Sequence, residues 1–187
     1  NRLVAGVNII DGSIDNQQFV NIGGQKGALL SSSIDRSKNT SFFIEDSFYF
    51  LPNVAAIAGT QFLHATRNRQ DRFLSDGNAS GSTEFNIWSP KAGLLWNVDP
   101  TWQVFGNISK SAEVPSFGEN SFGPNVPFIP FTSIRPQIAT TYEIGTRGRR
   151  PDYTWDLAAY RAEIRNELQC LTVTPGSCDV RNADRTM

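Results

Sequence analysis

The sequence predicts an all-β protein whose strands form an antiparallel, up-and-down β-barrel in a membrane. Three observations support this fold class. Extended segments carry apolar side chains at every second position, and tight turns alternate with long polar segments between them. No apolar run approaches the roughly 20 residues that a membrane-spanning helix requires. Short turns on one side and long loops on the other are typical of barrels in outer membranes.

The composition agrees with this fold class. The 187 residues are 39% hydrophobic and have a mean hydropathy of −0.32. These values suggest a soluble protein, but in a barrel only every second strand residue faces lipid. The formal net charge is −1, so the charge does not point to a nucleic-acid partner. The chain begins inside a strand pattern, without a signal segment, and stops in polar sequence, so we expect a fragment of a longer protein.

Seven segments show the alternation of a strand. In the clearest one, Trp102 and Val104 alternate with Gln103 and Asn107, which turns apolar side chains to lipid and polar ones to the lumen. Pro90 lies in another and cannot donate a ladder hydrogen bond, so we expect a strand end or bulge there. The expected strands are 2–10, 41–51, 54–66, 85–97, 102–111, 137–148 and 153–169. The tight turns are Pro52-Asn53, Asn97–Thr101 and Arg150–Asp152, and the long loops are 11–40, 67–84, 113–136 and 166 to the end.

Aromatic residues gather beside the tight turns. Trp96 and Trp102 flank one turn, and Tyr153 and Trp155 follow another. Rings in these places fit the aromatic girdles at the two membrane surfaces. A soluble β-sandwich, serving as a carbohydrate-binding or adhesin module, would use the same rings as its core and is the alternative. The long loops favour the barrel, because sandwich connections are usually short at both ends.

The chain lacks the patterns of an enzyme. It has no Gly-x-Ser-x-Gly elbow, phosphate loop or HExxH motif, and its one histidine, His64, falls on an expected strand. We therefore expect no catalytic residue, no bound metal and no cofactor. Cys170 and Cys178 lie in a single expected loop without the CxxC spacing of redox or zinc motifs. A loop-closing disulfide in an oxidising compartment is the favoured interpretation, and two free thiols are the alternative.

Several segments, in the same order along the chain, resemble the TonB-dependent outer-membrane receptors. An aromatic-x-Asn-x-Ser strand runs into a proline-containing loop, and a Tyr-Glu-x-Gly strand follows it. The matching segments are 44–46 (IED), 89–94 (SPKAGL), 104–119 (VFGNISKSAEVPSFGE), 134–137 (IRPQ), 141–147 (TYEIGTR) and 182–186 (NADRT). Two positions depart from the family pattern: Gln137 stands where Glu is usual, and Gln61 where Arg is usual.

The resemblance implies a 22-stranded barrel with a plugged lumen, of which residues 1–187 would hold seven strands, or eight if the tail or 11–40 adds one. The plug domain and the C-terminal strands would lie outside this chain. The whole protein would sit in the bacterial outer membrane and import a scarce nutrient, such as a ferric siderophore, ferric citrate or a related chelate, energised through TonB. Its partners would be outer-membrane lipid, its own plug domain, the TonB complex and the chelate. A general porin is a further alternative, which would lack the plug.

The same resemblance suggests where ligands and plug would be contacted. Loop side chains would bind the substrate, although the arginines could instead be neutralised by Asp71 and Asp76 and the rings could pack on neighbouring loops. The substrate-binding candidates are Arg67, Arg69, Arg72, Phe117, Phe122, Phe128 and Phe131. The lumen residues expected to face the plug are Glu45, Lys91, Asn107, Glu143 and Arg147.

Overall fold

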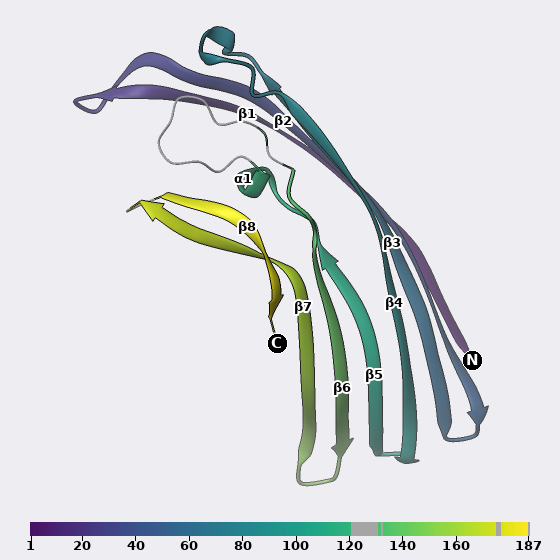
Figure 1. The fold of residues 1–187 in the computed structure, drawn as a ribbon. Helices are drawn as coiled ribbons and strands as arrows, with labels where there is room; N and C mark the ends of the chain where they lie inside the picture. Colours follow the sequence, from purple (N-terminus) through teal and green to yellow (C-terminus); the bar gives the residue numbers. More distant parts are fainter. Residues whose placement is uncertain (121–130, 132, 175–176, 187) are drawn as a thin grey trace.

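The computed structural model is one curved sheet of eight antiparallel strands in the order β1 to β8, so each strand pairs with its neighbours in sequence (Figure 1). The description covers residues 1–120, 131, 133–174 and 177–186. The expected all-β, up-and-down arrangement is confirmed. Within the described ranges, no helix is long and apolar enough to cross a membrane. The elements are β1 (Arg2–Ile22), β2 (Gln25–Leu51), β3 (Val54–Asp71), η1 (Leu74–Asp76), β4 (Gly81–Asp99), β5 (Trp102–Glu113), α1 (Phe117–Asn120), β6 (Gln137–Arg149), β7 (Thr154–Thr174) and β8 (Ser177–Thr186).

The connections divide into two groups at opposite ends of the sheet (Figure 1). At one end, short turns at Pro52-Asn53, Pro100-Thr101 and 150–153 join β2 to β3, β4 to β5 and β6 to β7. All three lie where the sequence predicted tight turns. The other end carries the β1–β2 turn, η1 and the end of the β7–β8 ribbon. We refer to these as the short-turn end and the long-loop end.

Two of the predicted loops, 11–40 and 166 to the end, are wrong. Residues 11–40 extend β1 and β2, which pair from Arg2↔Ser47 to Ile22↔Gln25, and the tail completes β7 and forms the eighth strand. These extensions lie beyond the apolar part of the sheet, where no side chain needs to face lipid, so they lack the alternation that identifies strands. Gly23 and Gly24 close the first ribbon with φ of 58° and 85°, as a type I′ turn requires.

The convex face carries an apolar band between two groups of aromatic rings. At its long-loop edge Phe42, Phe62 and Trp88 are direct cross-strand partners with ring centres 4.8–5.9 Å apart. Trp96 and Trp102 lie at the short-turn edge, and Trp102 Nε1 donates to a threonine hydroxyl at 2.8 Å. Trp88 and Trp96 are about 26 Å apart along β4, at about 3.3 Å per residue. A strand tilt of about 35–45° reduces this separation to about 20 Å along the membrane normal, which fits within the roughly 25 Å apolar band of outer-membrane barrels.

The β4–β5 ladder ends early. Its last pair is Lys91↔Ser109, next to Pro90, which therefore lies at the end of that ladder. The expectation of a strand end or bulge at this proline fits the ladder, although β4 itself continues to Gly81 on its pairing with β3. Because β5 and β4 separate here, the chain after β5 can turn across the concave face.

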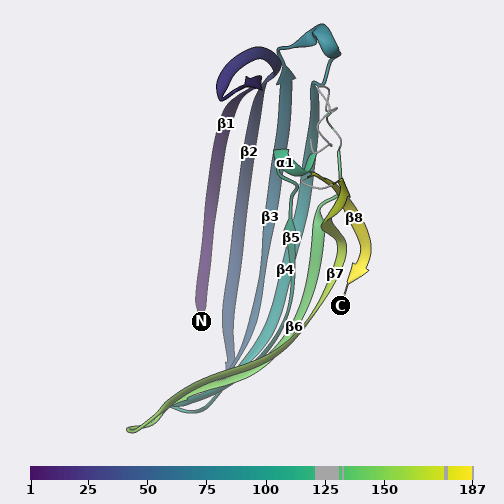
Figure 2. The same ribbon diagram turned by 90° about the vertical axis from the view of Figure 1, so that its left-hand side faces the viewer.

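Residues 112–120, which we call the covering segment, lie against the concave face of β3 and β4. Figures 1 and 2 both show α1 on this side of the sheet. The buried side chains of Ala65, Phe85 and Ile87 form a small apolar core, with Ala112 and Val114 packed against it. Among the described residues, this small apolar cluster thus forms where the segment after β5 folds onto the inner wall.

Candidate functional site

The residues predicted to line the lumen lie on the concave face, in cross-strand rows. Glu45, Gly59 and Lys91 are neighbours on β2, β3 and β4. Because Gly59 has no side chain, the Lys91 ammonium and the Glu45 carboxylate form an ion pair across it. A Cβ at Gly59 would lie 2.9 Å from the Ile44 carbonyl oxygen, so a larger residue would not fit without movement. Alternation predicted the face, whereas the pair depends on strand register.

Two further polar pairs lie on β5 and β6, in rows closer to the short-turn end. Asn107 Nδ2 donates to the Glu143 carboxylate at 2.7 Å, and Arg147 Nε donates to Gln103 Oε1 at 2.7 Å. Both pairs join direct cross-strand partners. The five predicted lumen residues therefore all have partners within the sheet, and their contact with a plug domain stays a prediction.

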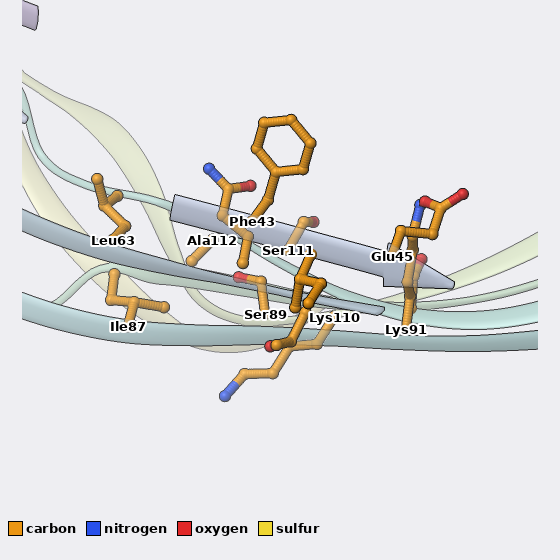
Figure 3. Close-up of a pocket in the computed structure, with 13 residues that line it drawn as sticks. Phe43, Glu45, Leu63, Ile87, Ser89, Lys91, Lys110, Ser111 and Ala112 are labelled. Carbon is orange, nitrogen blue, oxygen red and sulfur yellow. The ribbon is translucent and has the colours of Figure 1, made fainter. Parts of the chain in front are cut away.

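A depression of about 440 Å³ lies on the concave face between these pairs and the covering segment (Figure 3). Phe43, Leu63 and Ile87 give it an apolar surface, and Figure 3 shows Phe43 and Glu45 pointing to the same side of β2. The polar part of its lining consists of Glu45, Thr60, Gln61, Ser89, Lys91, Ser109, Lys110 and Ser111. Apolar walls with a few polar groups are typical of small-ligand sites. Among the described residues, no group of three or more His, Cys, Asp or Glu is placed to hold a metal ion.

Arg67 is buried, although the sequence placed it at the head of a loop. It lies within β3 on the concave face and is 6% exposed. Its Nε donates to the Pro115 carbonyl oxygen at 3.1 Å, and its Nη1 donates to Asn39 Oδ1 at 2.7 Å and to the Thr66 carbonyl oxygen at 2.9 Å. Burial lowers the pKa of the guanidinium from its ordinary value. Asn39 and Pro115 were missed because both fell in predicted loops.

Arg69 lies two residues further along the same face and is also covered. It binds Asp35 with two parallel hydrogen bonds, from Nε at 2.8 Å and from Nη2 at 2.7 Å. The Arg69 side chain is 11% exposed and Asp35 is 3% exposed. The sequence offered Asp71 and Asp76 as alternative, neutralising partners of the arginines. Only the pairing register of β2 with β3, which sets Asp35 opposite Arg69, identifies the true one.

Arg72 follows β3 and is the most exposed of the three arginines. Its Nη1 lies 3.4 Å from an Asp15 carboxylate oxygen, and about half of its side chain is open to solvent. The Asp71 carboxylate instead accepts backbone hydrogen bonds from Phe73 and Ala79, both at 2.8 Å, and so closes the loop around η1. Arg72 is thus the most solvent-exposed of the three predicted arginines, and its contact with a ligand stays a prediction.

The predicted aromatic contacts are described only in part. Phe117 lies in α1 and is half-buried. Phe131 packs against Gly81, since a Cβ on that glycine would come within 2.5 Å of the ring. Phe122 and Phe128 lie outside the described residues. At least one ring therefore packs on a strand, β4, whereas the alternative interpretation expected packing on neighbouring loops.

The cysteines lie on the β7–β8 ribbon and not in a loop. Cys170 is disulfide-bonded, and Cys178 is the only other cysteine of the sequence. The side chain of Cys178 falls outside the described part of the chain. Pairing of the two stays the expectation that the sequence raised.

The short-turn end is tied together by one charged cluster. Asp99 accepts hydrogen bonds from the hydroxyl and the amide of Thr101, both at 2.7 Å, and from Arg150 Nη2 at 2.9 Å. These bonds, with the nearby charge of Arg150, lower the pKa of the Asp99 carboxyl to about 2. The β4–β5 turn is thereby fixed to the β6–β7 turn outside the apolar band.

Comparisons with known proteins agree with this geometry. The model of the family "TonB dependent receptor-like, beta-barrel" matches residues 2–186. Three solved structures share the fold: the copper transporter OprC (TM-score 0.70, 12% identity, 97% of this chain and 30% of that one), the ferric yersiniabactin uptake receptor FyuA from Yersinia pestis (0.67, 13%, 89% and 26%), and the alcaligin outer-membrane receptor FauA from Bordetella pertussis (0.57, 14%, 96% and 30%). A comparison with curated proteins finds no match.

The chain spans less than a third of the length of these three receptors. At 12–14% identity they establish the fold, and the family match over residues 2–186 establishes the relationship. Proteins of this family are outer-membrane transport proteins and not enzymes, so the expected compartment and the absence of an enzyme activity are both confirmed. The β-sandwich alternative is excluded. The chain therefore belongs to the family of TonB-dependent receptors of the bacterial outer membrane and is matched to their β-barrel.

Proposed function

We propose that this chain is barrel wall in a receptor that imports a scarce nutrient chelate, such as a ferric siderophore, ferric citrate or a related compound, energised through TonB. The observation that carries the proposal is the family match over residues 2–186. The structural relatives named for ferric yersiniabactin, alcaligin and copper are in keeping with a metal or chelate as cargo.

The concave face suggests how the wall serves this task. Glu45–Lys91, Asn107–Glu143 and Arg147 carry charge on the face where a plug domain would lie, and buried charge inside a barrel needs partners or water. We assign these residues to contact with the plug. Towards the long-loop end, Arg72 offers an accessible cation to an anionic chelate. The rings proposed to contact the chelate are Phe117, Phe122, Phe128 and Phe131.

The test is uptake by the full-length receptor in cells that lack their own chelate receptors. Radiolabelled iron would be supplied as a catecholate, hydroxamate, phenolate or citrate chelate, and copper as its free ion, with and without a functional TonB. Uptake of one chelate that requires TonB supports the proposal. A receptor that is present in the outer membrane but takes up none of these probes would overturn it.

Two charge-removing variants test whether Arg72 contributes to chelate binding. Arg72→Met should raise the concentration of an anionic chelate needed for half-maximal uptake by about threefold to tenfold, because one exposed cation is lost from the mouth of the site. Lys38→Met removes a cation that lies on the opposite, convex face of β2, and it should leave uptake unchanged.

A further inference from the structure

We infer that Arg67 is a positioning residue that fixes the covering segment to the inner wall, and so sets the shape of the depression beneath it. The inference rests on the proposed function only where it concerns ligand affinity. The geometry that supports it is independent of the ligand.

The first step is the burial of both partners. Pro115 is among the side chains below 2% exposure, and Arg67 is 6% exposed. Nε of Arg67 reaches across from β3 to the Pro115 carbonyl, while Nη1 is held by Asn39 on β2 and by its own strand at Thr66. Of the three acceptors described for this buried guanidinium, two lie on the strands β2 and β3 and one, the Pro115 carbonyl, lies in the loop. The loop is therefore fixed to the wall by a charge-assisted hydrogen bond away from solvent.

The second step is the apolar contact next to this bond. Ala112 and Val114 pack on the core of Ala65, Phe85 and Ile87, immediately before Pro115. Beyond it, Ser116 and Glu119 bond each other's backbone amides, at 2.6 and 3.4 Å, and shape the turn into α1. The covering segment is thus held by packing, by Arg67 and by its own turn.

The residues just before β6 are also attached to the sheet. Thr83 Oγ1 and Ser133 Oγ are 2.9 Å apart, and Phe131 packs on Gly81. Asn182 of β8 donates to the Arg135 carbonyl oxygen and accepts from the Arg135 amide, both at 2.8 Å. The described flanks on both sides of 121–130 are therefore attached to strands of the sheet.

The third step connects this attachment to the site. Lys110 and Ser111 line the depression and lead directly into the covering segment, whose first residue, Ala112, also lines it. Release of Pro115 from Arg67 would let this wall move away from Phe43 and Ile87. Arg67 is only 6% exposed, which leaves a chelate little of its surface to contact, so we expect its effect on binding to be indirect.

The experiment measures how well the covering segment is shielded in the full-length receptor in detergent micelles. A reporter cysteine replaces the half-buried Val114 (Val114→Cys), and its labelling by a maleimide is timed with Arg67 intact and with Arg67→Met. Methionine keeps most of the side-chain length and removes every donor. Labelling is expected to be at least about tenfold faster in Arg67→Met, since hydrogen bonds to a charged group are lost. Arg72→Met is the matched control and should leave the rate unchanged.

Equal labelling with and without Arg67 would overturn the inference. If Arg67→Met does not fold, Asn39→Ala decides the matter: it removes one acceptor of the guanidinium and should accelerate labelling by about threefold or more. An unchanged rate in Asn39→Ala, with Arg67→Met unfolded, would make Arg67 a general stability residue and also overturn the inference.

Uptake supplies a readout that a purely structural role would not move. With the chelate identified by the uptake panel, Arg67→Met should raise the half-saturating concentration and keep the maximal rate per receptor. A lower maximal rate at unchanged half-saturation would argue against positioning. If the panel identifies no chelate, the proposed function fails, while the labelling experiment still decides the role of Arg67.

Discussion

The buried ion pair between Asp35 and Arg69 allows a sharp quantitative prediction. Both side chains are covered, and two hydrogen bonds of 2.7 and 2.8 Å join them. Removal of one partner from such a pair leaves an uncompensated buried charge and costs about 3–5 kcal/mol. We expect Asp35→Asn to lie at the lower end, about 3 kcal/mol, because the amide still accepts one hydrogen bond.

The assay is hydrogen exchange, followed by mass spectrometry, of the full-length receptor in detergent. Peptides covering residues 31–38 and 67–71 report the opening of the β2–β3 ribbon beyond the apolar band. When reclosing is fast, the exchange rate follows the population of the open state. A loss of about 3 kcal/mol then corresponds to exchange that is about 150-fold faster.

A matched pair provides the control. Asp15 and Arg72 form an ion pair at the same end of the sheet, but both are about half-exposed, and such pairs contribute about 0–1 kcal/mol. Asp15→Asn should therefore change exchange by less than about fivefold. The double variant Asp35→Leu with Arg69→Met should return close to the parent rate, because no charge is left buried. The reasoning is refuted if Asp35→Asn behaves like Asp15→Asn.

Three further predictions follow from the described contacts. Gly59→Val should lower the thermal stability of the receptor in detergent and separate the Lys91–Glu45 pair, because the new Cβ meets the Ile44 carbonyl at 2.9 Å; a melting temperature equal to that of the parent would contradict it. The folded-state pKa of Asp99 lies at about 2, below its unfolded value of about 3.9, so its stabilisation of the turn is present above pH 4 and lost as the pH falls towards 2. Spectroscopic titration of the Asp99 side chain should show this midpoint, and an ordinary midpoint near pH 4 would argue against the bonds to Thr101 and Arg150. Trp88→Ala should lower the midpoint of urea unfolding in lipid vesicles by an amount equivalent to about 2–4 kcal/mol, since ring contacts to Phe62 and Phe42 are lost, and an unchanged midpoint would exclude that contribution.

Strand recognition from the sequence succeeded only where the chain contacts lipid. Between Phe42 and Leu51 or Trp102 and Ile108, the two faces meet different solvents, so apolar and polar residues must alternate. Beyond the apolar band this requirement ends. Residues 11–22, 25–40, 166–174 and 177–186 are in strands because their backbones pair, and pairing of backbone groups leaves no periodic trace in side-chain polarity.

The predicted site residues divide in the same way. Alternation was enough to place Glu45, Lys91 and Asn107 on the inner face. It could not show that Lys91 binds Glu45 across Gly59, because that contact depends on the register of three strands. The exposure of Arg72 and the burial of Arg67 were equally invisible, since both follow the strand that the sequence predicted at 54–66.

The sequence by itself thus determined the antiparallel strands within the apolar band, their tight turns and the face of the sheet on which the predicted lumen residues lie, because these follow from local periodicity and from proline and aspartate at the turns. Only the tertiary structure decided which of those polar residues are covered. The covering segment folds onto the inner wall where β4 and β5 part, and it contacts the buried Arg67. Arg69 is covered as well, and the partners Pro115, Asn39 and Asp35 of the two arginines lie more than 25 residues away in sequence. Contacts between such distant residues depend on the path of the whole chain, which no local pattern of side chains records.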